Sequence, residues 1–310
     1  MKLLKYILYI SPLLIFIGIA TSRELGKGSS ELGSKKNPIK FYFTPSVDAS
    51  KITTSADKLI AFLEKETGYH FVSAIPADYV TVVESFGSGK ADIAIVNTFS
   101  YLLANEKYGA TARLRVIRGN GETYYAGCLL VKSDSGIDSL SQLNGKKVAF
   151  VDPSSTSGYI LPKALLKKNN VNIADEVFAK KHDIVVTMIY QNQVDAGATY
   201  FSPPDKSTGI PRDARERVIT QYPDVFQKIK VLTVTEKIPN DPVMFRKDLP
   251  ENLVKKVTDA LFKFVSTEEG MESLYEIYSV RGLTKTKDSD YDVLRDLLKR
   301  INFKIDLSNK

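Results

Sequence analysis

The chain is poor in the residues that build covalent frameworks and metal centres. Its 310 residues include no tryptophan, two histidines and one cysteine, Cys128. A single cysteine excludes an internal disulfide and a cysteine-based metal site, and apolar neighbours such as Leu129 favour a buried, inert thiol. His70 and His182 lie too far apart in the sequence for the paired spacing of a zinc enzyme. We expect no metal and no other cofactor.

Catalytic motifs are also missing. The sequence contains no G-x-S-x-G elbow, no G-x-x-x-x-G-K-[ST] phosphate loop and no G-x-G-x-x-G fingerprint. Gly119-Asn120-Gly121 is typical of a hairpin turn and is too short to cradle a phosphate. No set of nucleophile, base and orienting group can be assembled, so we expect a protein that is not an enzyme.

The charge balance is only mildly basic. Lys and Arg total 43 against 36 Asp and Glu, which gives a net charge of +7 spread along the chain. This excess is compatible with an anionic ligand, and the lack of a basic block with interleaved aromatics predicts that no nucleic acid is bound. A hydrophobic share of 43% is ordinary for a globular protein. The length is sufficient for two domains of about 100–150 residues each.

The N-terminus has the pattern of a secretory signal. Lys2 and Lys5 precede an apolar run that ends at Gly18-Ile19-Ala20, with small residues where a signal peptidase reads. The run is shorter than the roughly 20 residues of a membrane span, which favours a cleaved signal over an uncleaved anchor. We therefore predict a signal peptide over 1–20, a flexible Gly/Ser-rich leader over 21–37 and a periplasmic or extracytoplasmic location.

Strand and helix patterns alternate after the leader, as in α/β proteins with parallel sheets flanked by helices. Their order predicts two lobes between which the chain crosses twice, near Tyr124–Lys132 and Val231–Ile238. We assign residues 38–127 plus 236–310 to the first lobe and 128–235 to the second. A ligand is expected in the cleft, where strand ends and helix N-termini converge.

The segment Val148–Pro162 is the most informative part of the chain. Four apolar residues predict a buried strand, Asp152-Pro153 ends it, and a helical pattern begins after the hydroxyl-rich run 154–157. Because the first N–H groups of a helix lack partners and the macrodipole is positive there, Ser155, Thr156 and Ser157 could surround an anion. The alternative is that one of these hydroxyls only caps the helix.

Three further sites have two readings each. Asn97-Thr98-Phe99-Ser100-Tyr101 follows the strand ADIAIV, so Thr98 or Ser100 could cap a helix, while Ser100 and Tyr101 could bind an oxyanion. His182 could be a surface residue or a hydrogen-bond donor to an anion. Asp241, between Pro239 and Pro242, suits a turn or a ligand contact.

Several tyrosines stand at predicted strand ends. Tyr125 is one of them, and we expect these side chains to lie in the core or on the wall of the cleft.

The ordered set of these motifs resembles the phosphate/phosphite/phosphonate substrate-binding proteins of ABC importers over about residues 38–305. The motifs are TYYAG at 123–127, SLSQLNGKK at 139–147, VAFVDPSSTSGYILP at 148–162, His182-Asp183, QVDAGA at 193–198 and IPNDPVMFRKDLP at 238–250. The resemblance implies a type II periplasmic-binding-protein fold: two lobes, each a mostly parallel sheet with helices, joined by a two-strand hinge.

The resemblance also implies a ligand site. The hydroxyl turn that holds the oxyanion falls on Ser155, Thr156 and Ser157, and the histidine of the His-Asp motif falls on His182. The serine and tyrosine of the first lobe fall on Ser100 and Tyr101. The aspartate between prolines falls on Asp241, which could accept a hydrogen bond from a protonated ligand oxygen. We also expect Tyr125, as an aromatic residue of the cleft wall, to contact the ligand.

One departure bears on the ligand. Family members that take aminated phosphonates use an acid in the loop after the DAGA-like strand, whereas here Tyr200–Pro204 carries no carboxylate. We therefore expect a small phosphorus oxyanion, or a phosphonate with an apolar tail, captured by a monomer and delivered to an ABC transporter permease. Two alternatives stay open: the same fold binding a sulfonate or another organic anion, and a membrane-tethered sensor domain.

Overall fold

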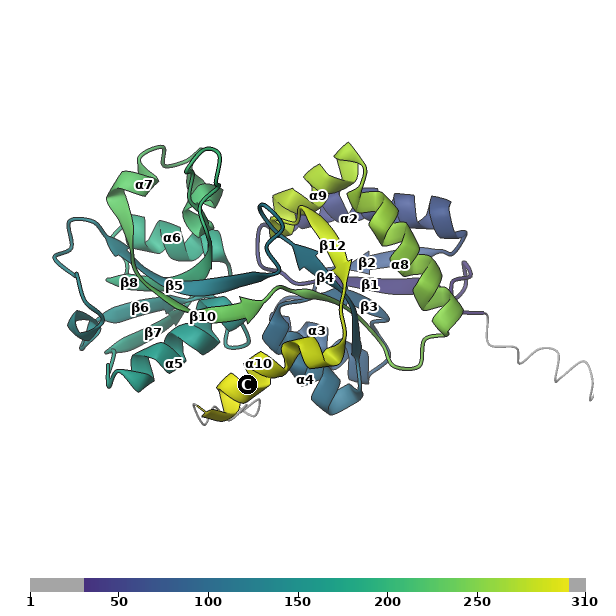
Figure 1. Cartoon of the computed structure of the whole chain (residues 1–310), viewed down its shortest axis with the longest axis horizontal. Helices are drawn as coiled ribbons and strands as arrows, with labels where there is room; N and C mark the ends of the chain where they lie inside the picture. The colour runs from purple at the N-terminus through teal and green to yellow at the C-terminus, as the bar shows by residue number, and fades with distance from the viewer. Residues whose placement is uncertain (1–30, 301–310) are drawn as a thin grey trace, which may run out of the picture.

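The computed structural model describes residues 31–300, which form two α/β lobes side by side (Figure 1). The predicted signal peptide and leader residues 21–30 lie outside the described residues. The two-lobed α/β fold predicted from the sequence is confirmed.

The first lobe is built on a six-stranded sheet. In spatial order its strands are β12 (Gly282–Lys285), β4 (Thr111–Ile117), β11 (Pro242–Phe245), β3 (Ile93–Ile95), β1 (Ile39–Phe43) and β2 (Phe71–Ala74). The strand β1 alternates buried and half-buried residues, whereas β3 is buried throughout because helices cover both faces of the sheet.

Helices of the first lobe lie on both faces of this sheet (Figure 1). On one face, α2 (Ala49–Thr67), α8 (Glu251–Val265) and α9 (Glu268–Tyr278) pack against one another; the other side carries α3 (Tyr79–Gly87), α4 (Thr98–Tyr108) and α10 (Asp292–Arg300), with the short turn η4 (Asp288–Tyr291) before it. Helix α2 is closed by standard signals, since the Asp48 carboxylate caps its N-terminus and Gly68 ends it with φ of 72°.

The second lobe has its own mixed sheet. Its strands run in the order β10 (Ile229–Pro239), β5 (Tyr124–Lys132), β8 (Ala196–Ser202), β6 (Lys147–Phe150) and β7 (Asp175–Phe178), and β9 (Arg212–Asp213) pairs with β8. Its helices and turns are η1 (Leu140–Leu143), η2 (Thr156–Ile160), α5 (Leu161–Lys168), α6 (His182–Tyr190), η3 (Ala214–Val218) and α7 (Val225–Lys228).

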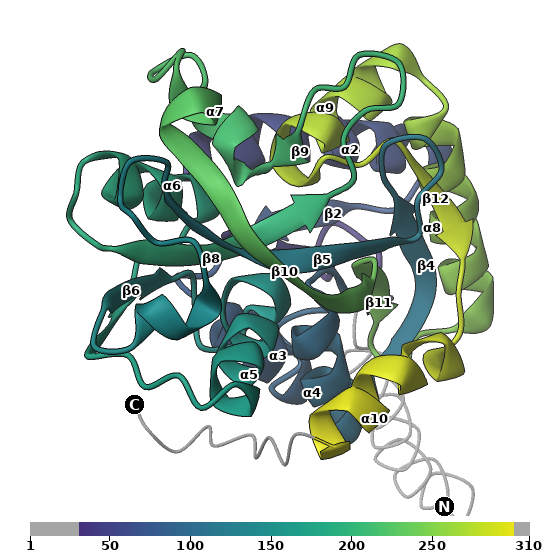
Figure 2. The ribbon, with the colours of Figure 1, turned by 60° about the vertical axis from the view of Figure 1, so that its left-hand side comes forward.

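The strands β5 and β10 connect the second lobe to the first. They pair antiparallel from Ile229–Lys132 to Pro239–Tyr124, and Figure 2 shows them running side by side into the first lobe. Because these strands and β11, β4 and β12 run against their neighbours, each sheet is parallel only in part, at β2–β1–β3 and at β8–β6–β7. The sheets are therefore mixed, whereas the sequence pattern predicts mostly parallel ones.

Residues 31–37, which the sequence pattern assigns to the flexible leader, form a tight turn against the first lobe. The Gly33 amide donates to the Asn37 carbonyl at 2.8 Å, and the His70 amide donates to the Gly33 carbonyl at 2.7 Å. Between residues 31 and 300, no helix is both long and apolar enough to span a membrane.

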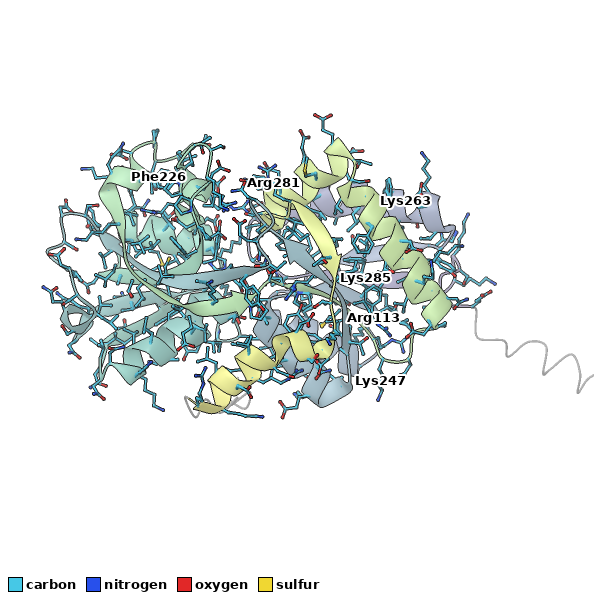
Figure 3. The ribbon with its side chains drawn as sticks, viewed as in Figure 1. Arg113, Phe226, Lys247, Lys263, Arg281 and Lys285 are labelled. Atoms are coloured by element: carbon cyan, nitrogen blue, oxygen red, sulfur yellow. The ribbon has the colours of Figure 1, made fainter. Side chains whose placement is uncertain are left out.

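Charged side chains are dispersed over the surface of the molecule. Lys247, Lys263 and Lys285 stand apart from one another on the first lobe (Figure 3). This distribution fits the mild basic excess read from the sequence, in which no single block of positive charge stands out.

The two lobes pack against each other at the N-terminal end of α4. Ile160 and Leu161 of the second lobe belong to the same buried apolar cluster as Phe99 and Leu102 of the first. Ile160 and Phe99 are almost fully buried, so the structure has the closed arrangement of the lobes.

Candidate functional site

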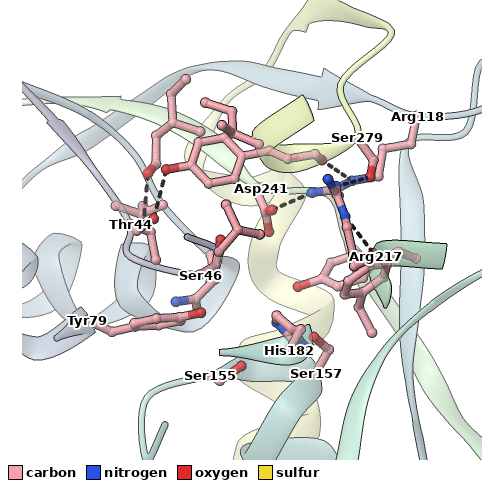
Figure 4. Close-up of a pocket in the computed structure, with 18 residues that line it drawn as sticks. Thr44, Ser46, Tyr79, Arg118, Ser155, Ser157, His182, Arg217, Asp241 and Ser279 are labelled. Carbon is pink, nitrogen blue, oxygen red and sulfur yellow. Dashed lines mark hydrogen bonds and ion pairs between the residues drawn. The ribbon is translucent and has the colours of Figure 1, made fainter. Parts of the chain in front are cut away.

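A cavity of about 60 Å³ lies between the lobes (Figure 4). The second lobe lines it with Ser155, Ser157, His182, Tyr200 and Arg217; the remaining polar wall is Thr44, Ser46, Tyr79, Asn97, Arg118, Tyr125, Asp241 and Ser279. Five of the eight residues predicted as ligand contacts thus meet here: Ser155, Ser157, His182, Asp241 and Tyr125.

The hydroxyl-rich segment has the strand–turn–helix form that its sequence predicts. Strand β6 ends before Asp152, whose carboxylate accepts the Ser154 amide at 2.7 Å. Pro162 has no N–H to donate to the Gly158 carbonyl in the first helical turn. That carbonyl instead accepts the Val151 amide at 3.1 Å, and Thr156–Ile160 winds as one wide π-helical turn before α5.

This local geometry leaves two backbone donors free. The Gly158 amide is taken by the Ser155 hydroxyl at 3.1 Å. The amides of Thr156 and Ser157, by contrast, have no acceptor within residues 31–300. They open a continuous helical segment that runs on through α5, where unpaired N–H groups carry partial positive charge. The segment can therefore hold an oxyanion.

Thr156 is not among the residues that line the cavity. Its hydroxyl donates to the Asn97 side-chain oxygen at 2.8 Å and accepts the Phe99 amide at 2.9 Å, both in the other lobe. The predicted anion contact of this hydroxyl is replaced by a bridge between the lobes. Asn97, rather than Thr98 or Ser100, also caps α4, because its side chain accepts the Phe99 and Ser100 amides.

Ser100 and Tyr101 are likewise placed away from the cavity wall. The Ser100 hydroxyl accepts from the Asn97 amide group at 2.8 Å. The Tyr101 hydroxyl donates to Asp288 at 2.6 Å, and its ring packs on Tyr291. Helix α4 therefore turns both side chains into the first lobe, and only Asn97 of this turn reaches the cavity.

His182 is a buried, neutral donor at the N-terminus of α6. Its Nδ1 lies 2.8 Å from the Thr199 hydroxyl, and its ring meets the edge of Tyr200. Burial, reinforced by the charges of Arg217 and Arg118, lowers the pKa of His182 from 6.5 to about 3. The imidazole is therefore uncharged at neutral pH, which decides between the single-donor and double-donor forms considered from the sequence.

Asp241 is held by an ion pair with Arg118. One carboxylate oxygen accepts from the guanidinium at 2.5 Å, while the other, Oδ1, is buried without a partner among the described residues. Arg118 also donates to the Asn240 side chain and the Tyr278 carbonyl. The free oxygen of Asp241 is an acceptor on the cavity wall.

Two tyrosines close the cavity from the remaining sides. Burial and the neighbouring Asp152 raise the pKa of Tyr79, and its hydroxyl has no partner among the described residues. Burial and Asp241 raise the pKa of Tyr125, and the nearby Arg118, Ser157 and Thr156 oppose this rise. Both phenols stay protonated at neutral pH, so each can donate a hydrogen bond.

Among the polar lining residues that the sequence motifs do not identify as contacts, Tyr79, Arg118 and Arg217 bear most directly on the charge and hydrogen bonding of the cavity. Tyr79 follows Asp78 in a helix that reads as an ordinary amphipathic element, and both arginines lie outside the ligand motifs. No group of three or more His, Cys, Asp or Glu side chains suited to a metal occurs in residues 31–300.

The two lobes, the crossing strands and the cavity between them define a two-lobed binding protein of the type that closes on a small ligand. The family model for periplasmic substrate-binding proteins of phosphonate ABC transporters matches residues 41–291. This match covers most of the chain, so the chain belongs to that family.

Two characterised relatives are similar over part of their length. The phosphate-import protein PhnD of Mycolicibacterium smegmatis is 31% identical over 176 residues, 53% of this chain and 55% of the relative. The phosphonates-binding periplasmic protein of Escherichia coli is 25% identical over 214 residues, 67% of this chain and 60% of the relative. The chain thus spans less than two thirds of either relative.

Solved structures share the fold at low identity. A binding-protein component of an ABC phosphonate transporter from Pseudomonas aeruginosa superposes with a TM-score of 0.74 at 21% identity, over 86% of this chain and 87% of that one. PhnD1 of Prochlorococcus marinus in complex with methylphosphonate gives a TM-score of 0.71 at 14% identity, over 85% and 98%.

Proposed function

We propose that this protein is the substrate-binding component of an ABC importer and captures a phosphorus oxyanion in the cavity between its lobes. The observation that carries the proposal is the pair of unpartnered amides at Thr156 and Ser157, beside the Ser155 and Ser157 hydroxyls. Fixed backbone and hydroxyl donors at the start of a helix replace the water that surrounds an anion in solution.

The second lobe supplies the primary grip on the ligand. Two amides and the serine hydroxyls bind the oxygens, and each bond to a charged acceptor is stronger than a neutral one. His182 adds a donor in one of its two neutral tautomers: when Nδ1 accepts from the Thr199 hydroxyl, Nε2 carries the proton and donates to the ligand.

The first lobe closes over the bound anion and distinguishes its protonated form from its deprotonated form. The free oxygen of Asp241 needs a donor, and the hydroxyl of a singly protonated phosphorus oxyanion provides one. The Tyr79 hydroxyl, also unpartnered, is free to donate to another ligand oxygen. We therefore propose that the bound form is the monoanion.

The walls around these groups favour a small, uncharged substituent on phosphorus. Among residues 31–300, Asp241 is the one carboxylate that lines the cavity, and Arg118 already neutralises it, so these residues offer an ammonium group no counterion there. Val47, Ile95, Val96 and Ile277 form the aliphatic part of the wall. Methylphosphonate, which PhnD1 of Prochlorococcus marinus binds, phosphite and phosphate all fit this description.

A sulfonate is the alternative ligand, and a membrane-tethered sensor is the alternative role. A sulfonate carries no proton at neutral pH and would leave the Asp241 oxygen facing an oxyanion, which disfavours it. The tethered role depends on residues 1–20, outside the described part of the chain. Mass spectrometry of the mature N-terminus separates cleavage, which our proposal of a periplasmic protein predicts, from retention.

A ligand panel tests the proposed function. Phosphate, phosphite, methylphosphonate, 2-aminoethylphosphonate and methanesulfonate are each added to the protein, and melting shifts are confirmed by calorimetry. A ligand at one hundred times its Kd stabilises the fold by about 2.7 kcal/mol. We expect this from at least one of the first three anions. The proposal fails if none of the three shifts the melting temperature or if methanesulfonate binds most tightly.

A further inference from the structure

Arg217 occupies an unusual position at the boundary between the lobes. It belongs to η3 of the second lobe and lines the cavity (Figure 4), yet its guanidinium reaches the end of α9 in the first lobe. It donates to the Ser279 hydroxyl at 2.6 Å and to the Glu276 carbonyl. Its Nε donates to the Tyr200 hydroxyl at 3.1 Å.

The short helix η3, which carries Arg217, is held in place by a buried ion pair and by core packing. Asp213 caps η3 by accepting the Arg215 amide, and the two side chains form a buried ion pair at 2.7 Å. Val218, the next residue along, is buried in the core of the second lobe. The guanidinium is therefore directed across the cleft by a fixed scaffold.

In the first lobe, Arg217 contacts the C-terminus of helix α9. Helix α9 ends at Tyr278, and Ser279 stops it in the left-handed region with φ of 55°. The last carbonyls of a helix carry partial negative charge and favour a cation. Arg217 thus fastens the first lobe to the second only when the lobes are together.

No full negative charge balances Arg217 directly. Its hydrogen-bond partners are hydroxyls and backbone carbonyls, and it takes part in no ion pair within residues 31–300. The other arginine of the cavity, Arg118, is matched by Asp241. Withdrawing a cation from water is unfavourable unless an opposite charge is near. Burial opposes the charge of Arg217, and Tyr200 and the neighbouring Glu216 outweigh it and raise the pKa of Arg217. Glu216 accepts from Tyr275 rather than from the guanidinium, so the closed cavity holds one positive charge that no carboxylate of the described residues contacts.

We propose that Arg217 is an anion-dependent clamp between the lobes: the bound oxyanion supplies the missing negative charge, and the guanidinium then holds α9 against the second lobe. The inference rests on the proposed function, since it requires an anion in the cavity. A monoanion neutralises the unmatched charge. Closure of the lobes and recognition of the charge then occur together. As a consequence, the lobes separate more readily when the anion is absent.

The test compares two substitutions of Arg217 with a matched control. Arg217→Gln removes the charge, and Arg217→Lys keeps it while losing the planar fork. The control is Tyr275→Phe, which deletes another bond between the lobes, the 2.8 Å contact from the Tyr275 hydroxyl to Glu216. Tyr275 does not line the cavity, and Arg281 packs over its ring at 3.9 Å in either form.

Affinity and dissociation rate are measured for the phosphorus oxyanion that the unmodified protein binds best. We expect R217Q to bind roughly ten- to a hundred-fold more weakly, as for a lost bond to a charged group, mainly through faster dissociation. R217K should recover a large part of this loss, and Y275F should stay within about threefold of the unmodified protein.

The outcomes separate the clamp from its alternatives. Unchanged affinity of R217Q overturns the clamp alone, and so does an equal loss in R217Q, R217K and Y275F, which would make Arg217 a strap without a charge role. If the unmodified protein binds none of the phosphorus oxyanions, the proposed function fails and the clamp falls with it.

Discussion

The protonation state of the ligand can be tested through Asp241. Its Oδ1 faces the cavity without a partner while Oδ2 is paired with Arg118. A dianion would place a second unprotonated oxygen against this carboxylate. Two like charges about 4 Å apart repel by about 4 kcal/mol at the effective dielectric of a protein surface. The ion pair with Arg118 offsets part of this repulsion, so the preference for the monoanion should reach at most about a thousand-fold.

Affinity should therefore follow the ligand's second ionisation. Above that pKa the monoanion becomes about tenfold scarcer per pH unit, so the apparent Kd of methylphosphonate should rise about tenfold per unit. Calorimetry between pH 6 and 9, in buffers of different ionisation enthalpy, should detect the uptake of about one proton on binding at the alkaline end. A Kd that is constant, or that falls, across this range would refute the reasoning.

Asp241→Asn provides the comparison. The amide has the same shape but can donate a hydrogen bond, and it removes the negative charge opposite the ligand. The variant should lose the alkaline fall in affinity and should bind the dianion at least as well as the monoanion. Unliganded melting temperatures of both proteins across the same pH range control for changes in stability.

Other predictions concern the hydroxyl turn and His182. Ser157→Ala should weaken oxyanion binding by about 1–3 kcal/mol in calorimetry; Thr156→Val should instead destabilise the closed lobes, seen as a larger unliganded radius of gyration in X-ray scattering. Gly158→Ala should lower the melting temperature, because its methyl carbon would lie 2.5 Å from Val151. His182 has a folded-state pKa of about 3 against 6.5 when unfolded, so stability should fall by about 1.4 kcal/mol per pH unit as pH drops below 6.5.

Each of these predictions has an experimental outcome that would contradict it. Full affinity in Ser157→Ala would remove that hydroxyl from the site, and an unchanged radius in Thr156→Val would remove its role in closure. A Gly158→Ala protein that melts normally would show that the turn can relax. If a His182→Gln protein loses as much folding stability on acidification as the parent protein, the imidazole does not cause the pH dependence.

Much of the fold could be predicted because its signals are local. The βα alternation, the lobe crossings and the strand–turn–helix at 148–162 all follow from short-range patterns and from Pro153 and Pro162. Strand β7 has no such local signal, because its four residues begin with two acids and lie at the edge of the sheet. The share of antiparallel pairs depends on how the crossing strands enter each sheet, which no local pattern specifies.

The site was predictable only where one segment builds it. The free amides at 156–157 follow from a helix start, but the direction of the Thr156 hydroxyl depends on Asn97, far away in the sequence. Tyr101 faces Asp288 because of the rotation of α4. Arg217 reaches its partners only after the lobes have met, so its role is a property of tertiary closure rather than of sequence pattern.

The most direct test of the account is a crystal structure of the protein with the phosphorus oxyanion that it binds best. We predict ligand oxygens at hydrogen-bond distance, about 2.7–3.1 Å, from the amide nitrogens of Thr156 and Ser157, with a ligand hydroxyl on Asp241. An anion seated elsewhere in the closed protein, with these two amides turned away from it, would contradict the central claim.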